Sequence, residues 1–278
     1  MKLRADMHVH TYFSDGLMSP AEVVAEAVKN GVQLISVTDH DGIAAYGQLP
    51  EICARAGVRL VNGIEVSAYS GDVKIHTLGY NVNAEDGAFR EFTAGLFSGA
   101  MERADDIVRK LNANGVAVTL REVTDRRRSP LSPVHVMHIA FACADKGYCG
   151  GNAFSFFKEY LALGKCAYSR IGRPTPEQAV EIITACGGFC SLAHPARIEM
   201  PREDTRRLIA RLKDCGLGGI EAVYTTHTVT ETAYYKETAK TFGLEITGGS
   251  DTHIKGGRQR IGHPVFYVDG VLAKKLKI

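Results

Sequence analysis

The sequence predicts an α/β fold built on parallel strands, either an open sheet or a barrel, and three observations support this prediction. Short apolar runs alternate along the chain with segments that carry helix-start and helix-stop signals. Strand character is weak from about residue 92 to residue 167, which indicates a helical insertion. The length of 278 residues suits one α/β barrel with such an insertion. We therefore expect an α/β domain at residues 1–91 and 168–278 and a helical subdomain at residues 92–167.

Apolar runs bounded by turn-forming residues predict the strands. The expected strands are Leu3–Val9, Gln33–Thr38, Val58–Val66, Lys74–Tyr80, Gly188–Ala193, Gly219–Val223, Leu244–Thr247 and Val265–Val268.

Three helices are predicted from a Ser or Thr N-cap that has Glu or Gln three residues later, and each ends at a glycine. They run from Ser19 to Gly31, from Thr175 to Gly187 and from Thr228 to Gly243. Helices of the insertion are expected at about Phe89–Asn114, Ser132–Lys146 and Asn152–Leu163. Strand, helix and strand in succession favour a parallel sheet or barrel.

Composition excludes several classes of protein. The net charge of +2 is too small to indicate a nucleic acid or a membrane as the partner. No apolar run reaches the length of a membrane-spanning helix, and the charged N-terminal residues are unlike a signal peptide. The seven cysteines are scattered without a Cys-x-x-Cys motif, which is typical of reduced thiols. We expect a cytoplasmic protein without an obligate protein partner.

His8 and His10 lie two residues apart on a predicted strand, so their side chains point the same way. Two neighbouring imidazoles at the end of a core strand are costly to bury unless they bind something. Glu65 lies inside an apolar stretch, where an unpaired carboxylate would also be costly. A cation is the simplest partner for both features.

Most of the further His and Asp candidates lie at or just beyond the C-terminal end of a predicted strand, or in the turn after the first strand, whereas His76 lies within the strand Lys74–Tyr80. These candidates are Asp15, His40, His76, His194, Asp251 and His253. Because the C-terminal ends of barrel strands converge on one face, we expect these residues to meet His8, His10 and Glu65 there. Imidazole and carboxylate ligands without thiolates favour Zn, Mn, Fe or Co over Ca. Nine ligands suit two or three ions, with Glu65 free to bridge them.

These residues form ordered motifs that resemble those of the polymerase and histidinol phosphatase (PHP) family of metal-dependent phosphoesterases. The motifs are His8-Val9-His10, Ser14-Asp15-Gly16, Thr38-Asp39-His40-Asp41, Gly63-Ile64-Glu65, His76, Ala193-His194-Pro195 and Gly249-Ser250-Asp251-Thr252-His253. The resemblance covers nearly the whole chain. It is strongest to stand-alone members that act on nucleotides, which include 3′,5′-nucleotide bisphosphatases and a 5′-to-3′ exonuclease on short RNA.

The resemblance implies a distorted (β/α)7 barrel of the TIM-like kind with a trinuclear metal centre. It assigns His8, His10, Glu65 and Asp251 to one metal, Glu65, His76 and His194 to a second, and Asp15, His40 and His253 to a third. A phosphate would lie across the metals. One departure is at Val136-Met137-His138, where members of the subgroup often have Arg-Pro-His. Recognition of a substrate phosphate would then differ here, or the run Arg126-Arg127-Arg128 would supply the charge.

The hypothesis for function is hydrolysis of a phosphate monoester, most simply a 3′,5′-bisphosphonucleotide to the 5′-monophosphate and phosphate, by a hydroxide that bridges two of the metals. The expected substrate is a small phosphorylated molecule, a nucleotide or a short RNA, and the expected cofactors are two to three divalent ions (Mn, Zn or Fe). Catalytic roles are predicted for Glu65, Asp15, His194 and His227, the last as a proton donor to the leaving group. Substrate contacts are predicted for Arg197, His138 and His227.

His135 and His263 are interpreted as structural, since neither ends a predicted strand. The leading alternative function is a 5′-to-3′ exonuclease on short RNA at the same metal site. Others are a histidinol phosphate phosphatase and a non-catalytic PHP module that only binds. An amidohydrolase on a similar barrel would usually need a metal-bridging Lys, for which the sequence offers no candidate.

Overall fold

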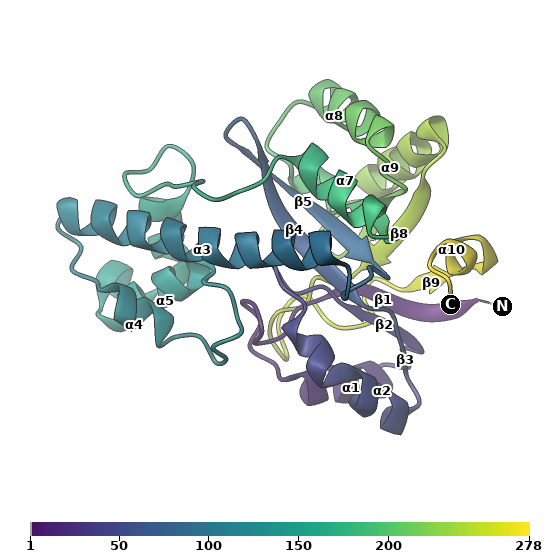
Figure 1. The fold of residues 1–278 in the computed structure, drawn as a ribbon, viewed down its shortest axis with the longest axis horizontal. Helices are drawn as coiled ribbons and strands as arrows, with labels where there is room; N and C mark the ends of the chain where they lie inside the picture. The colour runs from purple at the N-terminus through teal and green to yellow at the C-terminus, as the bar shows by residue number, and fades with distance from the viewer. Residues whose placement is uncertain (1) are drawn as a thin grey trace.

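A computed structural model describes residues 2–278 and contains two mixed β-sheets flanked by helices (Figure 1). The first sheet has the strand order β3-β2-β1-β9 and the second has the order β4-β5-β6-β7-β8. The strands of the first sheet are β1 (Leu3–Val9), β2 (Leu34–Val37), β3 (Arg59–Leu60) and β9 (Phe266–Val268). Those of the second are β4 (Gly63–Ser70), β5 (Val73–Tyr80), β6 (Phe189–Leu192), β7 (Gly219–Tyr224) and β8 (Glu245–Gly249). The predicted α/β class is confirmed.

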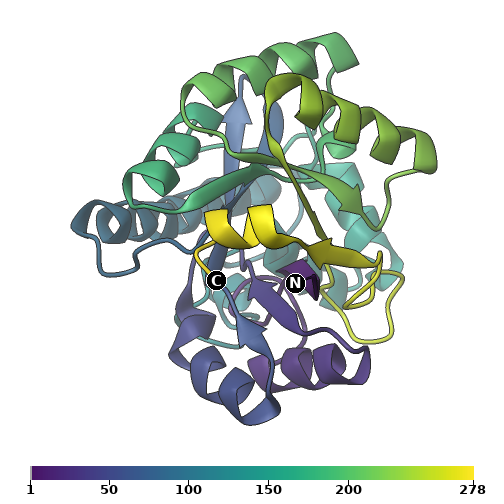
Figure 2. The ribbon, with the colours of Figure 1, turned by 90° about the vertical axis from the view of Figure 1, so that its right-hand side faces the viewer.

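The strands lie between two groups of helices, as Figures 1 and 2 show from two directions. Helices α1 (Pro20–Lys29) and α2 (Leu49–Ala56) flank the first sheet. Helices α7 (Pro176–Ala185), α8 (Arg202–Asp214) and α9 (Val229–Phe242) flank the second, and α10 (Gly270–Lys275) follows β9. The helices α1, α7 and α9 begin with the capping boxes that the sequence predicts. None of the helices within residues 2–278 combines the length and apolar content needed to cross a bilayer.

The insertion is helical, as predicted, and projects away from the sheets (Figure 1). It contains α3 (Gly87–Ala113), α4 (Leu120–Thr124), α5 (Val136–Asp145), α6 (Ala153–Phe156) and a π-helical turn at Phe157–Leu161. Its apolar residues form a separate hydrophobic cluster that includes Ile107 and Leu111 of α3. Phe89 and Leu96 of the same helix instead pack in the cluster beneath the second sheet. Helix α3 therefore belongs to both units and runs without a break through residues 91 and 92.

The predicted single strand Val58–Val66 is wrong, because the chain there forms β3 in one sheet and β4 in the other. Between them the Asn62 side chain donates to the Val82 carbonyl oxygen at 3.0 Å. A Cβ on Gly63 would lie 2.4 Å from Ser36 Oγ of β2, so this crossing admits only glycine. The strands on either side of β5 are also antiparallel to it, which differs from the expected all-parallel arrangement.

Isolated bridges join the two sheets at the C-terminal ends of β1, β2 and β8 and near the start of β4. One bridge pairs Val9 with Thr252, and the other pairs His40 with Glu65. Main-chain hydrogen bonds reinforce both, from the Asp251 amide to the His8 carbonyl at 2.7 Å and from the Asp41 amide to the Glu65 carbonyl at 2.9 Å. The backbone that connects the sheets therefore fixes several of the His, Asp and Glu residues selected in the sequence.

Candidate metal centre

All nine residues that the sequence selects as metal ligands lie in one cluster at the junction of the two sheets. His8 is on β1, Glu65 on β4 and His76 on β5, whereas the others follow a strand or lie in the loop after β1. Three groups within the cluster have ligand atoms that all lie within 4.8 Å of one another. The groups are His8, His10, Glu65 and Asp251; His40, Glu65 and His76; and His10, Asp15, His40 and His253.

The first group is fully buried around the ends of β1 and β8. His10 Nε2 lies 3.1 Å from Glu65 Oε2 and 3.1 Å from Asp251 Oδ1. His8 Nε2 lies 3.2 Å from the same Glu65 oxygen and 3.1 Å from His10 Nε2. Two imidazole nitrogens and two carboxylates thus face one small space, which is the donor set of a divalent metal site.

The other oxygen of Glu65 faces two further histidines, of which His76 belongs to the second group. His76 Nδ1 lies 2.7 Å from Glu65 Oε1, and His194 Nε2 lies 3.0 Å from it. His40 Nδ1 lies 3.2 Å from Glu65 Oε2. The two oxygens of one buried carboxylate therefore face different sets of histidines, which is the geometry expected of a bridging ligand.

The third group gathers on Asp15, in the loop after β1. His253 Nε2 lies 3.2 Å from Asp15 Oδ1, and His40 Nε2 lies 3.9 Å from the same oxygen. The His253 side chain is 25% exposed, whereas the Asp15 carboxylate is 6% exposed. This side of the cluster is thus the more accessible one.

Several buried ligand atoms have no hydrogen-bond partner among residues 2–278. They are Glu65 Oε2, Asp15 Oδ1, His76 Nε2 and His194 Nδ1. A buried carboxylate oxygen without a hydrogen bond is costly. Three imidazole nitrogens nevertheless approach Glu65 Oε2 at 3.1 to 3.2 Å. Such convergence without hydrogen-bond geometry fits cations between the side chains, so the residues present fit a divalent metal centre.

Hydrogen bonds on the far side of two imidazole rings orient them toward the cluster. His8 Nδ1 lies 3.0 Å from Glu221 Oε1, and His253 Nδ1 lies 2.9 Å from the Asp251 carbonyl oxygen. Each acceptor favours the tautomer with the proton on Nδ1 and leaves the Nε2 lone pair for a metal.

A layer of carboxylates that the sequence analysis did not select holds the loops of the cluster. Asp39 accepts hydrogen bonds from the Thr11 amide at 2.7 Å and from Ser14 Oγ at 2.6 Å. Asp6 accepts from the amides of Ser250 at 2.9 Å and Gly262 at 2.8 Å. The sequence could have identified Asp39, because it adjoins His40 in a selected motif. It could not have identified Asp6 in this way, because the hydrogen-bond partners of Asp6 lie more than 240 residues away in sequence.

The charged states within the cluster follow from burial and from neighbouring charges. Burial opposes ionisation of Glu65, but His76, His40 and His8 outweigh it and hold its pKa well below the ordinary value. Burial alone would lower the pKa of His10, yet the neighbouring carboxylates of Asp251 and Glu65 raise it to about 10. In the metal-free chain His10 therefore carries a proton that a metal must displace.

The profile of the PHP domain matches residues 6–216, which is more than half of the chain. The chain belongs to the PHP family. The resemblance proposed from the sequence motifs is thereby confirmed.

Three curated relatives of this PHP protein align over most of both chains. A 3′,5′-nucleoside bisphosphate phosphatase of Chromobacterium violaceum is 30% identical, over 93% of this chain and 90% of the relative. A phosphoribosyl 1,2-cyclic phosphate 1,2-diphosphodiesterase of Eggerthella lenta is 32% identical, over 91% and 95%. A 5′-3′ exoribonuclease of Haemophilus influenzae is 29% identical, over 98% of each. All three names describe phosphoesterases, which agrees with the enzyme class that the sequence predicts.

A solved structure from Chromobacterium violaceum, described as an amidohydrolase with bound sulfate and no metal, superimposes with a TM-score of 0.87. It is 28% identical and covers 98% of this chain and 95% of its own. The similarity therefore extends over the helical segment as well as the two sheets.

His227 does not join the cluster, which corrects its expected place as a catalytic and substrate-binding residue. Its Nδ1 lies 3.2 Å from the Ala222 carbonyl oxygen, and its Nε2 lies 3.4 Å from the Ala196 amide. The ring lies between Tyr224 and Tyr235, with centroids 5.1 and 5.7 Å away. Since both ring nitrogens face main-chain groups, His227 has no proton directed at the cluster.

Arg197 lies at the rim of the cluster, where it was expected. Its Nη1 lies 2.7 Å from Tyr224 Oη and 3.3 Å from Asp251 Oδ2. The side chain is 54% exposed, so part of the guanidinium remains accessible to an anion. Tyr224 Oη also donates to Asp251 Oδ2 at 2.6 Å, so this oxygen is held from the rim while Oδ1 faces the histidines.

His135 is part of the site, although the sequence analysis interpreted it as structural. Its Nδ1 lies 3.0 Å from Asp15 Oδ2, and its ring stacks on His40 with centroids 4.9 Å apart. His135 precedes a helix rather than following a strand, so strand position gave no signal for it. His138 supports this segment, since its Nδ1 accepts the His135 amide at 3.0 Å.

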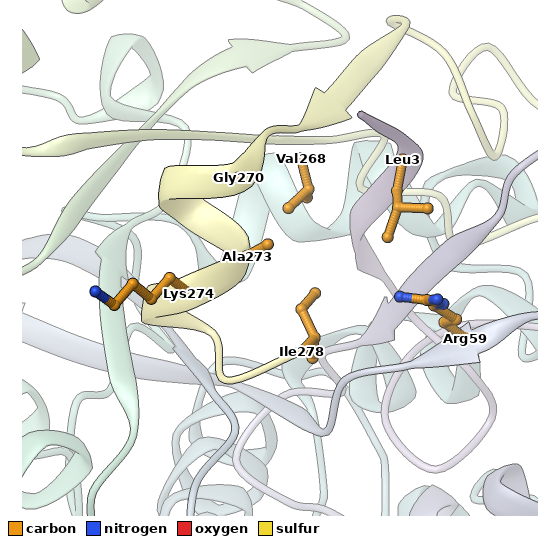
Figure 3. Close-up of a pocket in the computed structure, with 7 residues that line it drawn as sticks. All are labelled: Leu3, Arg59, Val268, Gly270, Ala273, Lys274 and Ile278. Atoms are coloured by element: carbon orange, nitrogen blue, oxygen red, sulfur yellow. The ribbon is translucent and has the colours of Figure 1, made fainter. Parts of the chain in front are cut away.

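A cavity of about 380 Å³ lies away from the cluster. Leu3, Val268 and Ile278 face it, and the amino group of Lys274 points away from its centre (Figure 3). Leu3 begins β1, whereas His8 and His10 lie at the other end of this strand. None of the seven lining residues is a histidine or a carboxylate, so this cavity has no part in the metal chemistry.

Proposed function

We propose that this PHP protein is a metal-dependent phosphatase that removes a phosphate from a nucleotide, with a 3′,5′-bisphosphonucleotide as substrate and the 5′-monophosphate and phosphate as products. The observation that carries the proposal is the position of Glu65, whose two buried oxygens face different sets of histidines. Three ligand groups that share residues suit two to three divalent ions, of Mn, Zn or Fe.

We also propose that the two sheets together form the distorted (β/α)7 barrel expected of the family. In this arrangement seven strands form a ring, and the bridges Val9–Thr252 and His40–Glu65 close it on either side of the cluster. The ligands then occupy the C-terminal face of the barrel, where sites of such folds form. The proposed domain division into residues 1–91 with 168–278 and residues 92–167 follows the two hydrophobic clusters except within α3.

Divalent ions bound here would polarise the phosphoryl oxygens of a substrate and lower the pKa of water at the site. The protein side chains position the ions and the phosphoryl group. Glu65, Asp15 and His194 hold the ligand groups in position relative to one another. Glu221 fixes the orientation of the His8 ring. Arg197 at the rim is placed to bind a non-bridging phosphoryl oxygen through its exposed N–H groups.

The bisphosphate phosphatase relative supports the nucleotide assignment, and the exoribonuclease relative supports the alternative of short RNA as substrate at the same centre. The cyclic phosphate diesterase relative adds a smaller diester as a third candidate. These reactions differ in their products, so one assay separates them.

Protein reconstituted with Mn and then with Zn would be incubated separately with adenosine 3′,5′-bisphosphate, a 5′-phosphorylated RNA pentamer, phosphoribosyl 1,2-cyclic phosphate and histidinol phosphate. Adenosine 5′-monophosphate and phosphate from the first substrate would support the proposal. Mononucleotides from the pentamer would replace it with the exonuclease. If metal-loaded protein cleaved none of the four, the nucleotide phosphatase proposal would be rejected.

A further inference from the structure

A second cavity, of about 250 Å³, opens beside Asp15, where the loop after β1 faces the insertion. Ser14, Asp15 and Gly16 line it on one side, and α5 lines it on the other. Because Asp15 also belongs to one of the ligand groups, this cavity adjoins the proposed metal centre.

Two arginines of the loop between α4 and α5 give the cavity a positive wall. Arg126 and Arg128 both line it, and both are exposed. Arg128 Nη1 donates to the Leu17 carbonyl oxygen at 2.7 Å, which fixes the guanidinium while using one of its five donors. Arg126 pairs with Asp145, so Arg128 is the arginine whose charge has no carboxylate partner among residues 2–278.

Aromatic and apolar side chains form another part of the wall, beside His138. Tyr12, Met137 and Phe141 line the cavity, and each is only partly buried. Partly exposed aromatic rings beside cationic groups suit a planar ring that carries an anion, because stacking and charge pairing then act together. The one carboxylate in the lining, Asp15, is already paired with His135 at 3.0 Å and His253 at 3.2 Å.

We propose that this cavity binds the base and the second, non-reacting phosphate of a nucleoside bisphosphate whose other phosphate lies at the metal centre. Arg128 binds the second phosphate, and Tyr12 with Phe141 stacks on the base. The inference rests on the proposed phosphatase function and specifies its substrate. A volume near 250 Å³ lies just below the range of about 300–1,000 Å³ that is typical of ligand sites, which favours a single nucleotide over an oligonucleotide.

The test compares Arg128→Gln, Tyr12→Ala and Tyr12→Phe in metal-reconstituted protein, with Arg121→Gln as the matched control. Arg121 is in the same insertion, its side chain is 90% exposed, and it does not line the cavity. Equilibrium dialysis would measure binding of adenosine 5′-monophosphate, and kinetics would compare adenosine 3′,5′-bisphosphate with adenosine 3′-monophosphate.

We expect Arg128→Gln to weaken binding of adenosine 5′-monophosphate about tenfold, which is typical for loss of one charge-assisted hydrogen bond. The preference in kcat/KM for the bisphosphate over the 3′-monophosphate should fall by a similar factor. Tyr12→Ala should weaken binding, Tyr12→Phe should restore it, and Arg121→Gln should match the wild type.

The two proposals fail in different ways. If phosphate is released but Arg128→Gln and Tyr12→Ala behave as wild type, the cavity is not the nucleotide subsite and the phosphatase function stands. If Arg128→Gln and Tyr12→Ala weaken nucleotide binding while no phosphate is released, the subsite stands and the proposed reaction is wrong. Absence of any nucleotide binding to the wild type would overturn the subsite.

Discussion

Glu221 Oε1 accepts a hydrogen bond from His8 Nδ1 at 3.0 Å, and both side chains are fully buried. The other oxygen of Glu221 accepts the amide of His194 at 2.8 Å. One carboxylate of β7 thus positions two proposed ligands that come from different strands, without itself facing the proposed ions.

Glu221→Gln should therefore weaken metal binding while the fold is retained. The amide has one oxygen, so it cannot accept from both His8 and His194 as the carboxylate does. Loss of such an outer hydrogen bond typically lowers metal affinity roughly 10- to 100-fold. Metal titration by calorimetry would measure the change, with Glu245→Gln on β8 as the control. Unchanged affinity in Glu221→Gln would mean that His8 needs no orienting partner.

His194→Ala should remove one metal ion from each chain and lower turnover at saturating metal by roughly 10²-fold or more. The reason is that His194 Nε2 and His76 Nδ1 meet at Glu65 Oε1, so the set that would hold the second ion (Glu65, His76 and His194) loses one of its three members. Metal analysis and steady-state kinetics would check this, with the exposed His263→Ala as the matched control. Wild-type turnover in the His194 variant would refute the arrangement.

Metal binding should release protons, and metal affinity should fall as the pH is lowered. The pKa of His10 is about 10 in the metal-free chain because Asp251 and Glu65 outweigh burial, so His10 is protonated at neutral pH. A metal must displace that proton, which costs up to about tenfold in apparent affinity per pH unit below the pKa. Calorimetry in two buffers of different ionisation enthalpy would count the protons. Proton-independent binding between pH 6 and pH 8, taken as roughly the working range of such a titration, would contradict this assignment of His10.

Asp106→Asn should lower stability at neutral pH and have no effect in strong acid. Burial opposes ionisation of Asp106, but Lys110, whose Nζ lies 2.7 Å from Asp106 Oδ2, and Arg109 lower its pKa below 3.8. A carboxylate with a depressed folded-state pKa stabilises the fold above its unfolded-state pKa, and the effect is lost as the pH falls through the folded-state pKa. We expect a loss of roughly 0.5–1 kcal/mol at pH 7, since Lys110 is partly exposed. Urea denaturation of both proteins at several pH values would measure it, and a constant difference down to acid pH would indicate packing instead.

The members of the cluster were predictable because they form short motifs beside strong strand signals. His8, His10 and Asp251 lie at or just after the C-terminal ends of β1 and β8, and Glu65 lies near the start of β4. The break between β3 and β4 was not predictable, since Val58–Val66 reads as one apolar run and the turn at Asn62 depends on contacts with Val82 and Ser36.

Helix α8 was missed for a different reason. It begins after Pro201 without a capping side chain, and its surface is rich in charged residues. Only the spacing of its buried residues Leu208, Ile209 and Leu212 marks one apolar face. The role of His135 depends on contact with Asp15, 120 residues earlier in the chain, which no local pattern shows.

Helix α3 has one end in each hydrophobic cluster, with Leu96 in one and Ile107 in the other. A continuous helix resists bending, so the insertion cannot swing at residues 91–92, where the predicted α/β domain gives way to the helical insertion. The rigid helix therefore fixes the distance between the ligand cluster and the loop that carries Arg126 and Arg128. This fixed distance would select substrates of one length. A change in substrate length would then call for a change in the loop between α4 and α5 or in the register of α3, rather than for a movement of the whole insertion.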